Sequence, residues 1–312
     1  MNGSQRDRRI LVIVNPHATT VSDRLRNLVI YALQGRFEVE VEATVRPDHA
    51  TEIGRGARDG AWDMVVAFGG DGTINEVANG LAGTEIPLAL LPGGNTNVVC
   101  RTLGIPTDVV EATELLLSMA DRPRIRRIAL GRVDERYFVF ACGCGLDASV
   151  VEKVDANPSL KSTAGPWFYS WSAVTSYYRE YLRDPVQFEV EVDGRRIEGL
   201  TCLAQNSDPY TYFGDRPVKA CPPVAIEEGS LSMAILKRAS QLDAITLVPR
   251  LLSGRLDASR HSQVEGLTDV REAIVRTKTA GRSFPVQVDG DHIGTFEQVA
   301  IAAVPDALSV VA

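Results

Sequence analysis

Two apolar segments of the chain each run directly into a pair of glycines, and this pattern constrains the fold more than any other feature. The segments are MVVAFGG (residues 64–70) and IPLALLPGG (residues 86–94), and the first leads straight into a helix-like stretch. A short, continuous apolar run indicates a strand buried on both faces, as in parallel sheets. Glycines at its end permit a tight turn and a close approach of the backbone to a ligand. The first third of the chain is therefore predicted to form a doubly wound parallel sheet.

Other strands and helices alternate with these two segments. Apolar patterning predicts strands at residues 10–16 and 37–44, the second half-exposed because valine alternates with glutamate. Helical spacing of apolar residues predicts four helices: 22–34 with Ser22 as N-cap, 48–60, 71–83 and 107–119. Strand–loop–helix repeats of this kind are typical of α/β domains.

The alternation of predicted strands and helices ends near residue 130. Strand-like segments then follow one another, several joined by short turns such as Asp193-Gly194 and Asp289-Gly290-Asp291, and helical stretches interrupt them at 165–182 and 240–254. Two domains are predicted. The first is an α/β nucleotide-binding domain of residues 1–129, with the segment 303–312 packing back on it. The second is an antiparallel, sandwich-like β-rich domain of residues 130–302, and we expect the active site in the cleft between them.

Asp71 immediately follows the first glycine pair, at the start of a predicted helix. Glycine loops that open a helix present backbone N–H groups to phosphate. A carboxylate beside a phosphate repels it unless a cation bridges the two, so Asp71 indicates either Mg²⁺ or a proton acceptor. The alternative is a tight turn in which the aspartate only caps the helix. Because the first lysine of the chain is Lys153, a lysine-dependent phosphate loop is excluded upstream of it.

Charge and composition narrow the classes of partner. The formal net charge of −7 argues against bulk nucleic-acid binding, which normally shows as a basic field. No apolar run approaches the ~20 residues that span a membrane, and no secretory signal is evident. The five scattered cysteines are expected to be reduced and structural in a cytoplasmic protein.

Three ordered motifs carry a resemblance to a known family: Asn15-Pro16, residues 69–76 and residues 92–97. They resemble, in order and spacing, the motifs of the diacylglycerol kinase catalytic domain family, which includes sphingosine kinases and bacterial soluble lipid kinases. Three segments of the second domain are similar to that family as well: 143–148, 227–231 and 288–291. The resemblance extends over residues 10–310, nearly the whole chain.

The resemblance implies a set of site residues. ATP phosphates are expected against the following residues: Asn15, Thr44, Gly69, Gly70, Asp71, Gly72, Thr73, Asn75, Glu76, Gly94, Asn95 and Thr96. Asp71 would organise the Mg²⁺ of MgATP. Asp291 would take the proton from the lipid hydroxyl, with Asp71 as the alternative base. Glu228, with the carbonyls of Ala225 and Ser230, would hold a second metal, unless this segment is only an exposed acidic turn.

Three positions depart from the family pattern: Asn95 stands where threonine is usual, Val98 where aspartate is frequent, and Ala129 where an acid commonly joins a structural Mg²⁺ network. The function that the resemblance implies is an ATP- and Mg²⁺-dependent lipid kinase acting on diacylglycerol or a related glycerolipid. A sphingoid-base kinase, a NAD kinase and a non-catalytic nucleotide- or lipid-binding protein are the alternatives. We expect a cytoplasmic protein in peripheral contact with a membrane. The aromatic stretch 165–182 is a candidate contact, and the alternative is a helix that packs its aromatic face on the β-rich domain. The oligomeric state stays open, with a homodimer among the options.

Overall fold

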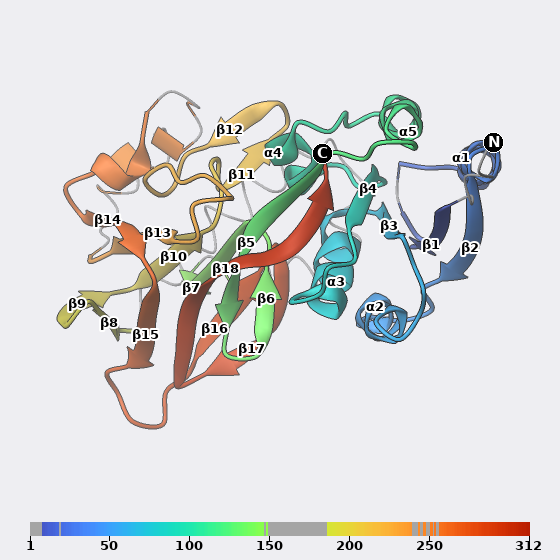
Figure 1. Cartoon of the computed structure of the whole chain (residues 1–312). Helices are drawn as coiled ribbons and strands as arrows, with labels where there is room; N and C mark the ends of the chain where they lie inside the picture. Colours follow the sequence, from blue (N-terminus) through green and yellow to red (C-terminus); the bar gives the residue numbers. More distant parts are fainter. Residues whose placement is uncertain are drawn as a thin grey trace. The chain divides into compact units, whose positions relative to one another are not determined.

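We describe a computed structural model of the chain (Figure 1). It describes residues 8–312 except the following: 19, 147, 149–185, 239–242, 244–245, 248–249, 252 and 254–255. The predicted helix 165–182 with its aromatic residues lies outside the described residues, as do Asp147 and much of the predicted helix 240–254. The chain divides into two compact units, residues 1–130 with 305–312 and residues 131–304.

The first unit is built on a parallel sheet in the order β2–β1–β3–β4. Its strands are β1 (Arg8–Val14), β2 (Phe37–Ala43), β3 (Met64–Gly69) and β4 (Leu88–Pro92). Every residue of β3 and β4 is buried, which explains their uninterrupted apolar sequences. The end of β18 (Gln298–Val311) joins β4 in parallel, pairing Val310 with Leu88.

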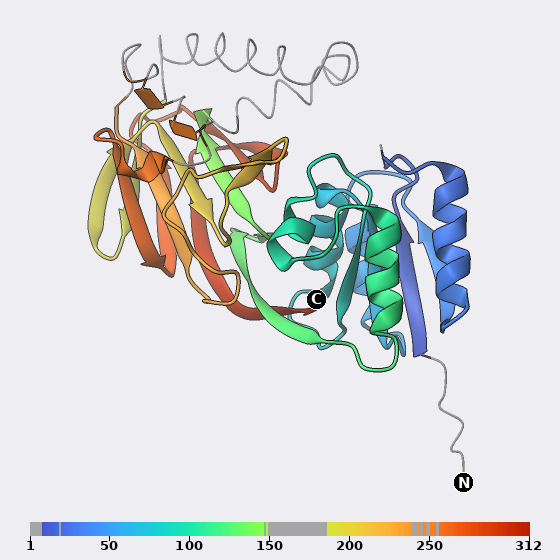
Figure 2. The same ribbon diagram turned by 90° about the horizontal axis from the view of Figure 1, so that it is seen from above.

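Helices pack on this parallel sheet. They are α1 (Asp23–Gln34), α2 (His49–Ala57), α3 (Asp71–Leu81), α4 (Val98–Leu103) and α5 (Val109–Ser118). Helix α1 contacts α5, and Figure 2 shows these blue and green helices next to each other. Helix α2 packs closely on α3, and both are labelled in Figure 1. The predicted N-cap of α1 is confirmed, because the Ser22 hydroxyl accepts from the N–H of Leu25. Helix α4 is a finding that the sequence patterns did not predict.

The second unit is an antiparallel β-sandwich. One sheet has the order β14–β13–β10–β7–β16–β17, and the other includes β18–β15–β8–β9. The strands are β7 (Ala141–Gly145), β8 (Phe188–Val192), β9 (Arg195–Gly199), β10 (Thr201–Gln205), β13 (Leu231–Leu236), β14 (Val264–Val270), β15 (Glu272–Thr277), β16 (Phe284–Val288) and β17 (Asp291–Phe296). Phe188 and Phe284 lie in its core with ring centroids 5.4 Å apart. All five cysteines of the chain are buried and free.

The predicted turns form as two-residue hairpin loops. Asp193 and Gly194 connect β8 to β9, and both have positive φ, as a type I′ turn requires. Asp289 and Gly290 connect β16 to β17 in the same way. Strands β5 (Ile125–Val133) and β6 (Arg136–Phe138) pair with each other and lie in segments that the sequence predicted to be strand-like. The paired strands β11 (Thr211–Phe213) and β12 (Arg216–Val218) escaped prediction, because three residues are too few to show an apolar period.

The fold class is therefore the predicted one, an α/β unit with a parallel sheet followed by an antiparallel β-sandwich. Within the part of the chain that the structure describes, no helix combines the length and the apolarity that crossing a membrane requires.

Candidate active site

The predicted polar loops of the first unit lie at one edge of its sheet. Asn15 follows β1, Gly70 follows β3 and Gly93 follows β4, and these three parallel strands are neighbours. Backbone hydrogen bonds join the loops, since Asn15 N–H donates to the Phe68 carbonyl (3.0 Å) and Gly93 N–H donates to the Gly69 carbonyl (2.8 Å). The carboxyl edge of a parallel sheet is where such folds bind ligands. The structure thus brings the predicted loops together.

The two glycine loops pack backbone against backbone. A Cβ atom on Gly94 would lie 2.9 Å from the Cα of Gly70, and one on Gly93 would lie 3.1 Å from the Cα of Gly69. Both distances are shorter than ordinary van der Waals contact, so side chains there would push the loops apart. Glycine is needed at these positions for packing as well as for any approach of a phosphate.

The start of α3 offers backbone N–H groups to an anion. Its N-cap is Gly70, which has no side chain to accept from the first amides of the helix. Beside it, the Asn15 amide donates to the hydroxyl of Thr73 (3.1 Å), and the Asn15 Oδ1 atom accepts from the N–H of His17 (2.9 Å). The helix dipole favours negative charge at this end. Asn15 and Thr73 are therefore fixed next to a candidate phosphate position.

Asp71 has a structural role that the sequence did not reveal. Its two carboxylate oxygens accept from the N–H groups of Val98 (3.0 Å) and Val99 (3.1 Å), the first residues of α4. The N-cap residue of α4, Asn97, makes no side-chain cap of its own. Burial raises the pKa of Asp71 above its usual value, whereas these N–H groups and the nearby Arg101 act to lower it. Asp71 thus caps a neighbouring helix across the two glycine loops.

The second loop is closed by its own asparagine. The Asn97 Oδ1 atom accepts from the N–H of Gly94 (3.0 Å), and its Nδ2 atom donates to the Gly94 carbonyl (2.7 Å). These two hydrogen bonds fix the loop that carries Asn95 and Thr96 at its tip. Asn95 is exposed and Thr96 is half-buried. Their side chains are therefore available for a ligand on a loop of fixed conformation.

Three further residues expected at the nucleotide have other contacts in the structure. The Glu76 carboxylate accepts from the N–H groups of Asp48 and Ala50, both at 3.0 Å, and so caps α2. Asn75 is fully buried, and its Oδ1 atom accepts from the side chain of Asn79 (3.1 Å). Thr44 is buried at the end of β2. A direct phosphate contact through Glu76 or Asn75 would have to compete with these bonds.

In the second unit, two aspartates flank Gly290 and differ sharply. The Asp289 carboxylate is buried and accepts from three backbone N–H groups, those of Val139 (2.6 Å), Phe140 (2.9 Å) and Ala141 (3.0 Å). Asp291 is exposed at the first position of β17. The sequence showed Asp289 only as a turn residue, because its three donors lie about 150 positions earlier in the chain.

The turn that contains Glu228 is closed on itself. The Glu228 Oε1 atom accepts from the N–H of Ala225 (3.1 Å), and the Glu228 N–H donates back to the Ala225 carbonyl (3.0 Å). Glu228 is exposed, whereas Ser230 is buried. Among the residues that the structure describes, no group of three or more histidine, cysteine or acidic side chains is arranged to hold a metal ion. The metal role predicted for Glu228, Ala225 and Ser230 stays a prediction.

Comparisons with known proteins agree with this architecture. Residues 9–133 match the model of the diacylglycerol kinase catalytic domain, and residues 141–312 match that of the YegS C-terminal NAD kinase beta sandwich-like domain. The chain is 30% identical over 231 residues to a diacylglycerol kinase of Bacillus subtilis (strain 168), covering 73% of each chain. It is 24% identical over 297 residues to a diacylglycerol kinase of Staphylococcus saprophyticus, covering 92% of this chain and 90% of the relative.

Solved structures share the fold. A diacylglycerol kinase from Bacillus anthracis str. Sterne superimposes with a TM-score of 0.70 at 19% identity, covering 98% of this chain and 97% of that one. Yeast NADH kinase gives a TM-score of 0.52 at 12% identity, covering 99% and 84%. Glycine loops on a parallel α/β unit, followed by a NAD kinase-like sandwich, define the class of two-unit kinase folds. Within that class, this chain belongs to the diacylglycerol kinase catalytic domain family.

Proposed function

We propose that this protein is an ATP-dependent lipid kinase that transfers the γ-phosphoryl group to a hydroxyl of diacylglycerol or a related glycerolipid. The observation that carries the proposal is the uncapped start of α3, packed against the second glycine loop in a chain of the diacylglycerol kinase family. Phosphoryl transfer needs little covalent chemistry from the protein, and positioning and charge neutralisation lower most of the barrier. Backbone N–H groups at a helix start provide both without a lysine.

In this proposal the nucleotide phosphates contact the loops directly, and some residues of α3 only hold the neighbouring elements in position. Asn15, Thr73 and the loop residues Asn95 and Thr96 face the phosphates together with the N–H groups of Gly70 and Gly72. Glu76 and Asn75 hold α2 and α3 in place rather than touching the ligand, as their hydrogen bonds suggest.

The residues present fit a magnesium ion carried in with the nucleotide. Mg²⁺ is usually bound through one or two carboxylates, substrate phosphates and several waters. The two oxygens of Asp71 offer about four acceptor positions, of which Val98 and Val99 take two. Asp71 would therefore hold the ion through the remaining positions. When bound, the ion would neutralise the charge that develops on the transferred group.

Asp291 is proposed as the group that takes the proton from the lipid hydroxyl. Its exposure leaves it accessible to a substrate, whereas the carboxylate of Asp289 is used by three backbone N–H groups. A general base contributes typically ~10²–10⁴-fold to the rate. We expect Asp291→Asn to lower kcat by about that factor with an unchanged melting temperature, while Glu297→Gln, an exposed acid beyond the other end of β17, keeps full activity.

The experiment that tests the function is a kinase assay with MgATP and a panel of acceptors, followed by mass spectrometry of the products. The panel contains diacylglycerol in mixed micelles, a sphingoid base and NAD. A phosphorylated glycerolipid is the expected product. Phosphorylated sphingoid base or NADP as the main product would replace the proposal with one of those kinases, and ATP binding without any product would identify a non-catalytic binding protein. Full activity of Asp291→Asn would move the base to Asp71.

Contact with a membrane follows from the proposed substrate, since a diacylglycerol resides in a bilayer. We propose a cytoplasmic protein that meets the membrane peripherally. Cosedimentation with vesicles that contain diacylglycerol, compared with vesicles that lack it, tests this contact. The oligomeric state, with a homodimer as one option, is read from analytical ultracentrifugation of the same preparation.

A further inference from the structure

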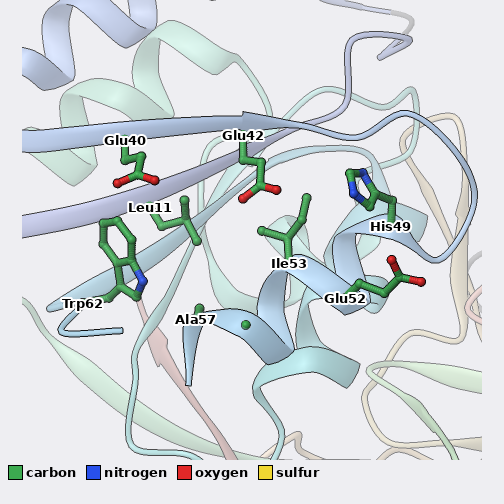
Figure 3. A pocket seen from close by; sticks show the side chains of 9 residues that line it. Leu11, Glu40, Glu42, His49, Glu52, Ile53, Ala57 and Trp62 are labelled. Carbon is green, nitrogen blue, oxygen red and sulfur yellow. The ribbon is translucent and has the colours of Figure 1, made fainter. Parts of the chain in front are cut away.

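A groove of about 410 Å³ lies between β2 and α2 in the first unit (Figure 3). Its volume falls in the ~300–1,000 Å³ range of small-molecule sites. The apolar part of the lining consists of Leu11, Ile53 and Ala57, all of them buried. The groove therefore has an apolar floor for the body of a ligand.

Carboxylates are spread along the groove. Successive side chains of a strand point to opposite faces, so Glu38, Glu40 and Glu42 lie on one face of β2. The last two line the groove, and Glu52 of α2 lines it from the helix side, with His49 nearby (Figure 3). Trp62 lies at the end next to Glu40. This acidic lining repels phosphate and attracts cations, whereas the glycine loops favour anions.

The chain itself shows which cation this lining accepts. The guanidinium carbon of Arg9 lies 4.1 Å from the centroid of the Trp62 ring, and its Nη2 atom lies 3.2 Å from a carboxylate oxygen of Glu40. An organic cation is thus already held on the indole and an acid at one end of the groove. Glu42, in the middle of it, makes no ion pair or hydrogen bond within the described residues.

The neighbouring groups keep the opposite end polar. Glu52 pairs with Arg46. The Nδ1 atom of His49 accepts from the N–H of Val45 (3.3 Å). The acids do not converge: among the described residues, no set of three or more is arranged around a metal ion. Separated carboxylates above an apolar floor complement an extended cation better than a compact one.

We propose that this groove binds an aliphatic polyamine. Its methylene chain would lie on Leu11 and Ile53. One ammonium group would pair with Glu42, and the others would share Glu40 with Arg9 and Glu52 with Arg46. This site is independent of the proposed kinase activity, because it lies on other residues and its test needs no turnover.

Isothermal titration calorimetry with spermidine tests the proposal at low ionic strength. Saturable one-site binding is expected. Hexaamminecobalt(III) carries the same triple charge without methylene groups, and we expect it to bind at least tenfold more weakly. Glu42→Gln should weaken spermidine binding about two- to fivefold, as expected for one exposed ion pair. Glu38→Gln is the charge control, since it makes the same change on the same face of β2 outside the groove. It also removes the 3.7 Å ion pair between Glu38 and the Nε atom of Arg9, and it should leave the affinity within twofold.

Three results would overturn the proposal. They are no saturable binding of spermidine at millimolar concentration, equal affinity for spermidine and hexaamminecobalt(III), and equal losses in Glu42→Gln and Glu38→Gln. The last two would show that only the diffuse negative charge of β2 attracts the cation. Because Glu42 is exposed and makes no ion pair or hydrogen bond within the described residues, its variant should remain as stable as the wild type within ~0.5 kcal/mol.

Discussion

The Asp289→Asn substitution examines the most heavily bonded carboxylate described in the second unit. Asp289 sits in a two-residue turn between β16 and β17, with φ of 49°. Asparagine tolerates that left-handed conformation, so the turn itself is conserved. What changes is the acceptor set, because one carboxylate oxygen becomes an amide NH₂ group.

The magnitude follows from the individual hydrogen bonds. Oδ2 accepts from Val139 at 2.6 Å, and Oδ1 accepts from both Phe140 and Ala141. If the amide oxygen takes the Oδ1 position, the N–H of Val139 faces another donor and stays unsatisfied, at a cost of about 1–3 kcal/mol. The other two bonds lose their charge assistance, which adds about 1 kcal/mol. The total loss of folding free energy is therefore about 2–4 kcal/mol.

Differential scanning calorimetry measures this loss. For a unit of this size, 1 kcal/mol corresponds to a shift of roughly 2–4 °C, so the transition of the second unit should move down by about 5–15 °C. Asp193→Asn is the matched control, since Asp193 occupies the same type of turn with φ of 49° but is exposed. That variant should melt within about 1 °C of the wild type, as is usual for an exposed site. If Asp289→Asn also melted within 1 °C, the three hydrogen bonds would not anchor the hairpin and the reasoning would be refuted.

Three further predictions concern the first unit. Gly94→Ala should lower the folding free energy by about 1–3 kcal/mol and weaken ATP binding in calorimetric titration. Gly80→Ala, whose Cβ would lie 2.8 Å from the Cα of Gly54, should lower the stability without weakening ATP binding, and equal ATP affinities of the two variants would contradict this. Glu76→Gln should lower the stability by about 1 kcal/mol and speed hydrogen exchange at the start of α2, and unchanged exchange would count against its capping role. Burial raises the folded-state pKa of Asp71 above the unfolded value, so the ionisation of Asp71 disfavours folding. The stability of the wild type relative to Asp71→Asn should therefore fall as pH rises above about 4. A rise of this relative stability in urea denaturation between pH 4 and 7 would contradict the predicted sign.

The sequence predicted the elements that carry a strong period and the loops that follow them. The strands of the first unit, the helix capped by Ser22 and the turn at Asp193 were recognisable because their signals are local. Helix α4 was not, since its six residues are too few for an apolar period. The role of Asp71 was also hidden, because its partners lie 27 and 28 residues away and become neighbours only when β3 and β4 pair.

Helix α3 shows why those non-local bonds matter for function. Neither Asp48 at the start of α2 nor Asn97 at the start of α4 caps its helix with its side chain, and the acids Glu76 and Asp71 of α3 take over both tasks. The N-cap residue of α3, in contrast, is Gly70, which has no side chain that could accept from the first amides of the helix. The starts of α2 and α4 are thus capped by carboxylates of α3, whereas the start of α3 has no side-chain acceptor. An incoming phosphate can accept from the N–H groups of α3 without displacing a protein carboxylate. This asymmetry selects the start of α3 among the three helix ends, and it predicts that a variant with an acceptor at the N-cap, Gly70→Asp, competes with ATP for the same amides.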